Sequence, residues 1–356
     1  MDFLIARGEL HETRFDDTPA QAPEPGQALL AVDRFGLTSN NITYAAFGDA
    51  MSYWDFFPGP DGWGRMPVWG FATVAESAVE GLEEGTRVYG YLPPSSDFIV
   101  QAEPNGSQGF VDASPHRAAL PAAYNSYLRT DADPSYEPER EDQTMLLRPL
   151  FFTSWLIDDF LREREMFGAG TVVLSSASSK TASGLAFLLS REGQAEVLGL
   201  TSPRSAAYAR SIGVYDEVLT YEELGELPSG RAVYVDMAGD AELRSALHEH
   251  FGAELAHSAV VGATHLDHLG AVPDALPGPR PTFFFAPDRV AKRRGEWGGD
   301  ELQRRLAEAW GPYVEWTDGW LQISHGDGAD AVRAAYLDVL DGRVEPSRAH
   351  VLSLTR

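Results

Sequence analysis

The stretch TVVLSSASSKTASGLA, residues 171–186, decides the fold predicted for this chain. It starts with an apolar, β-branched run typical of a buried parallel strand, and a turn of small hydroxyl residues then opens an apolar helix. This is the strand–turn–helix of a nucleotide-binding βαβ unit, in which N–H groups at the helix start hold a phosphate. Serines and a lysine stand where glycines are expected in that turn.

Three interpretations of the turn are open. Lys180 and Thr181 resemble the end of the phosphate loop GxxxxGK[ST], but Leu174 and Ser179 occupy its two glycine positions, which argues against a kinase or NTPase. The second interpretation is a dinucleotide site in which small residues replace the glycines. The third is a structural turn with a serine N-cap and no ligand.

The next predicted strand favours the dinucleotide site. It ends in Thr201, followed by Ser202, Pro203 and Arg204. An acidic residue at this strand end binds the ribose of NAD, whereas an arginine nearby accommodates the 2′-phosphate of NADP. The acid is absent and the arginine is present, so the pattern indicates NADP(H). Lys180, one of only two lysines in the chain, is expected to bind a phosphate.

The pattern of elements divides the chain. Strands and helices alternate from Gly170 onward, which predicts an α/β, doubly wound parallel sheet. The residues before about 130 are strand-rich, with turn signals between the strands. We expect a strand-rich substrate domain over 1–143, a Rossmann domain over 144–286, and a C-terminal segment, 287–356, that returns to the first domain.

Composition excludes several classes of protein. The 356 residues carry a formal net charge of −25, which disfavours nucleic acid and anionic membrane surfaces as partners. There is no cysteine, so disulfides, thiolate metal sites and cysteine nucleophiles are excluded. No segment has the ~18 uninterrupted apolar residues of a membrane span, and no signal peptide is apparent. The expected location is cytoplasmic.

Several segments, in order along the chain, together carry a family resemblance. They are NNITYAAFGDA from Asn40, WGFATVAESAVEGLEEGTRVYGYLP from Trp69, the stretch at 171–189, LTSPRSAAYARSIGVYDEVLTY from Leu200, YVDMAGDAELRSAL from Tyr234 and SAVVGAT from Ser258. The chain resembles the medium-chain dehydrogenase/reductase superfamily in its zinc-independent, quinone-oxidoreductase-like branch, as a divergent subfamily without a clear activity. The resemblance implies a Rossmann domain and a GroES-like first domain, and it makes a homodimer the expected assembly.

The resemblance also assigns roles to individual residues. Thr201, Ser202 and Arg204 would surround the 2′-phosphate, with Tyr221 stacked or hydrogen-bonded beside it, and Arg348 would reach the same phosphate. The pyrophosphate would lie on Ser178, Ser179, Lys180 and Thr181. Gly262 and Ala263 would pass close to the nicotinamide, and Asn41 would lie near its carboxamide.

The chemistry expected at the nicotinamide needs a proton donor. Hydride transfer to an electrophilic carbon leaves an oxyanion or enolate, which a hydroxyl can stabilise. Tyr44 is the leading candidate, because its segment faces the nicotinamide in the related enzymes, and Tyr53 and Tyr124 are alternatives. A buried tyrosine is otherwise core. The aromatic segment 44–69 either lines a cleft for an apolar or aromatic substrate or is core.

No metal is expected, because the zinc sites of the family need cysteine. His257, His265 and His268 are close in sequence but lack an accompanying carboxylate motif. The expected function is NADP(H)-dependent, zinc-independent reduction of an activated C=C or C=O bond of a small molecule, such as an enone, enoyl thioester or quinone. The alternative is a non-catalytic NADPH-binding sensor or structural protein. Residues 283–285, FFF, are a candidate pairing edge for the dimer.

Overall fold

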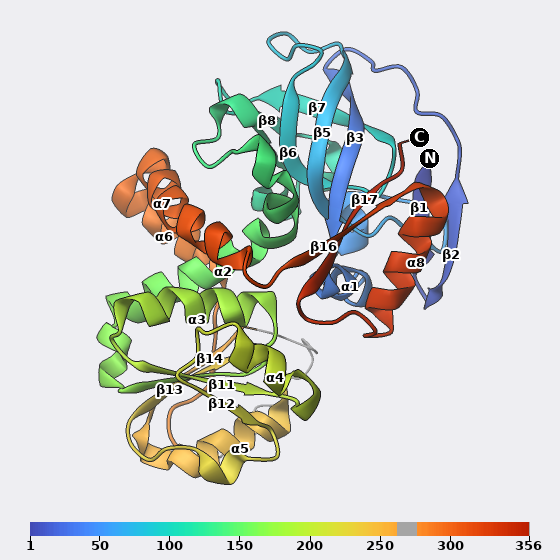
Figure 1. Cartoon of the computed structure of the whole chain (residues 1–356). Helices are drawn as coiled ribbons and strands as arrows, with labels where there is room; N and C mark the ends of the chain where they lie inside the picture. The colour runs from blue at the N-terminus through green and yellow to red at the C-terminus, as the bar shows by residue number, and fades with distance from the viewer. Residues whose placement is uncertain (262–275, 356) are drawn as a thin grey trace. The chain divides into compact units, whose positions relative to one another are not determined.

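A six-stranded parallel sheet forms where strands and helices alternate in the sequence (Figure 1). The computed structural model describes residues 1–261 and 276–355. The strand order is β12-β11-β10-β13-β14-β15. These strands are β10 (Thr171–Leu174), β11 (Glu196–Thr201), β12 (Glu217–Thr220), β13 (Ala232–Asp236), β14 (Leu255–Val260) and β15 (Thr282–Phe283). The predicted doubly wound α/β sheet is confirmed.

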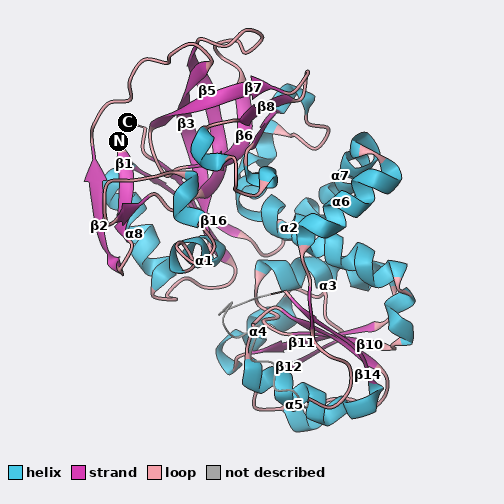
Figure 2. Ribbon diagram, turned by 180° about the vertical axis from the view of Figure 1, so that it is seen from behind, coloured by secondary structure: helices cyan, strands magenta, loops and turns pink. Residues whose placement is uncertain are grey.

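Helices cover both faces of this sheet, with α3 and α5 on opposite sides (Figure 2). The start of α5 shows how the local sequence sets a boundary, because the Asp240 carboxylate accepts hydrogen bonds from Glu242 N at 2.9 Å and Leu243 N at 3.1 Å. The helices of this part are α2 (Glu141–Glu163), α3 (Lys180–Glu192), α4 (Pro203–Ser211), α5 (Ala241–Phe251), α6 (Ala286–Trp297) and α7 (Gly299–Thr317).

Six strands of a second large sheet build a closed barrel. The order β3-β5-β6-β9-β8-β7 is completed by an additional pairing of β3 with β7, so the sheet returns on itself. The parallel pair β16-β17 continues from β3 outside this ring. The strands are β3 (Gln27–Leu37), β5 (Val68–Ser77), β6 (Arg87–Leu92), β7 (Asp97–Pro104), β8 (Gly109–Asp112), β9 (Ser126–Arg129), β16 (Gln322–Asp327) and β17 (Arg348–Ser353).

Smaller elements complete the barrel unit. A three-stranded sheet in the order β2-β1-β4 lies in this unit, and its helices include α1 and α8. Their bounds are β1 (Asp2–Ala6), β2 (Glu9–Asp16), β4 (Trp63–Gly64), α1 (Ser39–Ala46) and α8 (Gly328–Leu340). One hydrophobic core, which includes Leu30, Tyr91 and Tyr127, fills the barrel and extends to Tyr336 of α8.

The chain therefore divides into two compact units. The first contains 1–146 and 321–356, and the second contains 147–320. This corrects the predicted boundary between residues 286 and 287, because α6 and α7 belong to the parallel-sheet unit. Tyr313 of α7 stacks on Phe151 of α2 with ring centroids 4.2 Å apart, and Arg293 of α6 donates to Asp159 of α2 at 2.8 Å.

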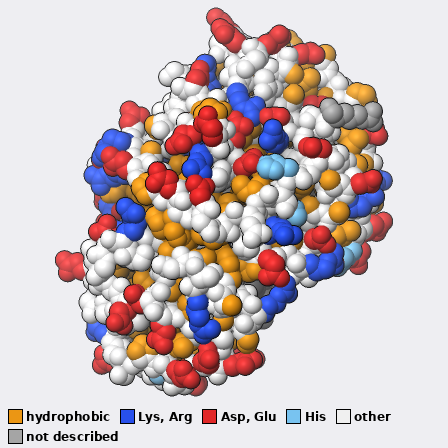
Figure 3. Space-filling view, in the orientation of Figure 1, with side chains coloured by type: hydrophobic (Ala, Val, Ile, Leu, Met, Phe, Trp, Pro, Cys, Tyr) orange, Lys and Arg blue, Asp and Glu red, His pale blue; other side chains and the backbone are white. Residues whose placement is uncertain are grey.

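The surface is acidic without a single charged patch on the face shown in Figure 3, where carboxylates are scattered among arginines and lysines. Among the described residues, no helix is long and apolar enough to cross a bilayer.

The edge strand β15 has exposed aromatic side chains. Phe283 in the strand is 42% exposed, and Phe285, two residues later, is 48% exposed. The homodimer stays a prediction, which light scattering of the purified protein would test.

Candidate functional site

The carboxyl ends of β10 and β13 meet at the point where the strand order reverses. From β10 the chain runs outward through β11 and β12, and it then returns beyond β10 to form β13 and β14. Ligands of open parallel sheets bind in the crevice outside the strand ends at such a point. The residues at these ends in the second unit therefore define the candidate cofactor site.

A buried network ties the ends of β10 and β13 together. The Ser175 hydroxyl donates to Asp236 Oδ1 at 3.2 Å and accepts from Met237 N at 2.9 Å. Asp236 Oδ2 accepts from Arg244 at 2.8 Å, and both side chains are buried. Burial raises the pKa of Asp236, while Gly239 N–H and Arg244 oppose that rise. These groups satisfy one another within the protein and link the ends of the two strands.

The turn after β10 has the backbone shape that glycine usually supplies. Ser176 has a φ of +51°, in the left-handed region that a non-glycine residue rarely adopts. Its backbone N–H donates to the Tyr221 hydroxyl at 3.1 Å. Ala177, the next residue of the turn, packs against Gly199 of β11. A Cβ at position 199 would lie 2.8 Å from the Ala177 Cβ, so glycine is needed for this close approach. The missing glycines have therefore not removed the tight turn.

The predicted pyrophosphate residues lie at the start of α3. The Ser179 hydroxyl caps the helix by accepting from Ala182 N at 3.2 Å, so the serine N-cap is present. The Thr201 hydroxyl at the end of β11 donates to the Ser178 hydroxyl at 3.4 Å. Lys180 is the first residue of α3, and Thr181 follows it within the first turn. Two neighbouring strand ends thus contribute hydroxyls to one place.

The predicted 2′-phosphate residues follow β11. Thr201 is buried, Ser202 is the N-cap of α4, and Arg204 is exposed in the first turn of that helix. Tyr221 lies in the turn after β12 and packs against the core of this unit. The hydrogen bond from Ser176 N to Tyr221 links the two turns. These residues, the Ser178–Thr201 pair and Lys180 all lie at the carboxyl edge of the same sheet.

Burial lowers the pKa of Lys180 to about 8 from its ordinary value of 10.5. Between pH 8 and 10.5 the unfolded chain therefore binds a proton at Lys180 that the folded chain lacks, so stability rises with pH in this window. Below pH 8 the full cost of holding the charged ammonium is present. A phosphate bound beside Lys180 would favour the charged ammonium and so oppose the effect of burial on its pKa.

We expect Lys180→Met to stabilise the ligand-free protein by about 1–3 kcal/mol at pH 7, with the gain vanishing as pH rises through 10.5. The same variant should bind NADPH about tenfold or more weakly, because it lacks the cation. Urea unfolding at pH 7 and pH 10 measures the first effect, and fluorescence titration measures the second. Lys292→Met is the control, since Lys292 is exposed and pairs with Glu163 and Glu296 at the surface. Equal effects of the two substitutions would contradict this assignment.

Some of the other predicted residues lie in the first unit, and the rest lie outside the described residues. Gly262, Ala263, His265 and His268 lie outside the described residues. Asn41, Tyr44 and Arg348 belong to the first unit, where Arg348 is exposed at the start of β17. The Asn41 amide accepts from Thr38 N at 2.8 Å and donates to Pro67 O at 3.2 Å. Asn41 therefore caps α1, and its role near a carboxamide stays a prediction.

Histidine does not form a metal cluster in the part of the chain that the structure describes. His257 stacks on Phe167 with ring centroids 4.3 Å apart, and burial lowers its pKa. Across residues 1–261 and 276–355, no group of histidine, aspartate and glutamate side chains is arranged to hold a metal ion.

Tyr44 is part of an aromatic cluster that the first unit assembles from five segments. We define this aromatic cluster as Tyr44 of α1, Tyr53 of the 3-10 helix Tyr53–Phe56, Trp69 of β5, Tyr91 of β6 and Tyr124 of the 3-10 helix Ala122–Tyr124. The Tyr44 ring lies 4.7 Å from Tyr53 and 5.5 Å from Tyr91. Tyr124 lies 4.7 Å from Tyr91 and 6.0 Å from Trp69. The structure thus brings together all three tyrosines proposed from the sequence.

Sequence reasoning did not single out Tyr91, which the structure places in the aromatic cluster. Tyr91 and Trp69 are direct partners in the antiparallel register of β5 and β6, and their rings are 5.1 Å apart. Tyr91 is fully buried, whereas Tyr53, Trp69 and Tyr124 are partly exposed. The available signal was the alternation of apolar and aromatic residues in β6, but a strand pattern does not identify the partner strand.

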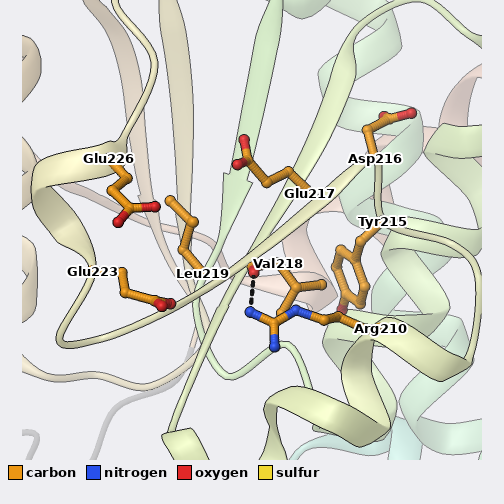
Figure 4. Close-up of a pocket in the computed structure, with 8 residues that line it drawn as sticks. All are labelled: Arg210, Tyr215, Asp216, Glu217, Val218, Leu219, Glu223 and Glu226. Carbon is orange, nitrogen blue, oxygen red and sulfur yellow. Dashed lines mark hydrogen bonds between the residues drawn. The ribbon is translucent and has the colours of Figure 1, made fainter.

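A hollow of about 460 Å³ lies at the outer edge of β12 (Figure 4). Asp216 and Glu223 in its wall accept backbone hydrogen bonds, from Val197 N at 2.7 Å and Thr220 N at 2.8 Å. Its acidity disfavours a phosphate, and the predicted site residues are absent from its lining. The lining residues are Arg210, Tyr215, Asp216, Glu217, Val218, Leu219, Glu223 and Glu226.

The strand-rich barrel unit and the parallel-sheet unit together form the two-part fold of the medium-chain dehydrogenases/reductases. Solved structures with this fold align with nearly the whole chain. CurA of Vibrio vulnificus in complex with NADPH is 14% identical, with a TM-score of 0.56, and the match covers 97% of this chain and 94% of that chain. The fold predicted from the resemblance is thus confirmed.

Two further structures give the same result. The yhdH oxidoreductase of Salmonella enterica in complex with NADP is 14% identical, with a TM-score of 0.57 and 99% of each chain covered. The quinone oxidoreductase of Coxiella burnetii is also 14% identical, with a TM-score of 0.58, covering 100% of this chain and 99% of that chain. A search among curated proteins finds no match. The chain belongs to the family described as "Protein of unknown function (DUF2855)", whose model matches residues 35–345.

Proposed function

We propose that this protein is an NADP(H)-dependent, zinc-independent oxidoreductase that reduces an activated C=C or C=O bond of a small molecule. The observation that carries the proposal is the assembly of two linked turns at the carboxyl edge of the parallel sheet. One turn carries Ser178 and Lys180, the other carries Thr201 and Arg204, and the Ser178–Thr201 hydrogen bond joins them. Hydroxyls, a helix N-terminus and two cations suit a phosphorylated dinucleotide.

The solved structures of the same fold support the choice of cofactor. CurA and yhdH are complexes with NADPH and NADP, and a third similar structure is a quinone oxidoreductase. In this chain, Lys180 and the start of α3 would hold the pyrophosphate, and Arg204 with Ser202 would hold the 2′-phosphate. When bound, NADPH supplies a hydride.

The aromatic cluster supports the choice of substrate class. Partly exposed aromatic rings suit a flat, apolar electrophile such as an enone or quinone. Tyr44 would give its hydroxyl proton to the oxygen or carbon that becomes anionic, as a general acid. Burial raises the pKa of Tyr44, so the hydroxyl stays protonated at neutral pH and is available as a donor.

Titration with NADPH and NADH tests the proposal. We expect NADPH to bind at least about tenfold more tightly, a difference of ~1.4 kcal/mol. A panel of enones, quinones and aldehydes, monitored by NADPH consumption, then identifies the reaction. Equal affinity for the two nucleotides would exclude the NADP(H) assignment. Tight NADPH binding without consumption by any electrophile would instead support the non-catalytic NADPH-binding alternative.

A further inference from the structure

The aromatic cluster contains two buried hydrogen-bond donors that lack an acceptor. Within the described residues, neither the Tyr91 hydroxyl nor the Trp69 indole N–H forms a hydrogen bond. A buried donor without a partner has lost its hydrogen bond to water with no replacement, and this cost arises twice for two such donors in contact. Such groups call for a state of the molecule in which they are satisfied.

Both donors belong to rings packed in the aromatic cluster with Tyr44, since Tyr91 contacts both Tyr44 and Trp69. The Tyr44 and Tyr91 rings meet edge to face at 85°, and Trp69 faces Tyr91 across β5 and β6. Burial raises the pKa of Tyr44, whereas contacts of its hydroxyl with Trp69, Asn40 and Tyr91 lower it. The two donors are thus near enough to influence the Tyr44 oxygen, although their present geometry is not that of a hydrogen bond.

We propose that Trp69 and Tyr91 are positioning residues, whose N–H and O–H groups are held ready for the phenolate oxygen that Tyr44 becomes on giving up its proton. This inference rests on the proposed function. The O–H bond of Tyr44 breaks, and the proton passes to the substrate atom made anionic by the hydride. The electron pair stays on the Tyr44 oxygen until water returns a proton.

Because the two donors have no acceptor while Tyr44 is neutral, they can stabilise the charge that develops on its oxygen in the transition state. An interaction accelerates a reaction only if it is stronger in the transition state than in the ground state. Donors that are unpaired while Tyr44 is neutral, and attracted when its oxygen becomes charged, meet this condition without reorganisation of solvent. If the two donors were already hydrogen-bonded to neutral Tyr44, they would stabilise the ground state as well, and the transition state would gain less relative to it.

The groups that face Tyr44 remain neutral when it ionises. Burial raises the pKa of Tyr53 to about 12 and that of Tyr91 and Tyr124 well above the ordinary value. The buried guanidinium of Arg117 lowers the pKa of Tyr91 slightly against burial and is paired with Asp112 at 3.1 Å. Tyr91 therefore keeps its proton and can act as a donor while Tyr44 carries the charge.

A site-specific titration tests the inference without cofactor or substrate. A fluorinated tyrosine at position 44, which is more acidic than tyrosine, is followed by ¹⁹F NMR against pH in the full-length protein. We expect Trp69→Phe and Tyr91→Phe each to raise its pKa by about one unit, since a hydrogen bond to an anion is of that size. Tyr89→Phe is the matched control: Tyr89 stacks on Trp69, but its hydroxyl donates to Thr144 O at 3.5 Å.

The inference is overturned if neither substitution moves the titration, as when a buried water accepts from both donors, or if Tyr89→Phe moves it equally. Circular dichroism and the pH of half-unfolding confirm that each variant remains folded over the range. Because the titration needs no nucleotide, failure to bind NADPH would defeat the proposed function alone. An unmoved titration in a protein that binds and oxidises NADPH would defeat this inference alone.

Discussion

Arg204→Glu is expected to abolish the preference for NADPH over NADH and to raise the Kd for NADPH about 100-fold. A charge-assisted hydrogen bond contributes ~1.5–3 kcal/mol, which corresponds to about 10- to 150-fold in affinity, and the new carboxylate adds repulsion. The Kd for NADH should change less than about threefold, since NADH has no 2′-phosphate. Arg204 is exposed in the first turn of α4, where glutamate also suits the helix dipole, so the variant should fold.

Fluorescence titration of both nucleotides at one ionic strength measures this preference. Arg210→Glu is the matched control, because it reverses the same charge six residues further along α4, where the side chain donates to Val218 O at 2.9 Å. It changes the net charge equally but stands away from the turn after β11. If Arg204→Glu leaves the preference for NADPH intact, or if Arg210→Glu removes it equally, the 2′-phosphate assignment is wrong.

Local patterns in the sequence were sufficient for most of the parallel sheet. The strand Ala232–Asp236 and the helix Ala241–Phe251 are examples, because a buried apolar run and an Asp240 N-cap mark them directly. The first strand pair and α6 were not predicted. The helix α6 has few apolar residues, and its Arg289 and Arg293 bind Asp159 of α2, about 130 positions earlier. A partner so distant leaves no local signal.

The candidate cofactor site likewise has features that local sequence predicts and features that it does not. Ser179 as a helix cap and Arg204 after a strand could be predicted, since both follow from neighbouring residues. The hydrogen bond from Ser176 N to Tyr221 could not, because it joins turns 45 positions apart and depends on the left-handed Ser176 backbone. The pairing of Trp69 with Tyr91 likewise depends on the β5–β6 register, which a strand pattern alone does not specify.

Tyr44→Phe is expected to lower kcat by about 10²–10³-fold with any electrophile that the protein reduces, while NADPH affinity stays unchanged. General acid catalysis contributes a factor of this size, and phenylalanine preserves the ring contacts with Tyr53 and Tyr91. Since the pKa of Tyr44 is raised, the wild-type rate should fall only on the alkaline side, above the ordinary value for tyrosine, as the donor loses its proton. The residual rate of the variant should lack this alkaline limb.

Steady-state kinetics against pH, at saturating NADPH, measures both effects. Tyr53→Phe and Tyr124→Phe discriminate between the three hydroxyls, because each removes one donor from the aromatic cluster and keeps its ring. A large loss of kcat in either, with a normal rate in Tyr44→Phe, would move the proton-donor role to that residue. Tyr89→Phe should retain the wild-type profile, since its hydroxyl is directed to Thr144 O. A proton donor must change both the rate and its pH dependence, whereas a tyrosine that only packs in the core would change stability instead.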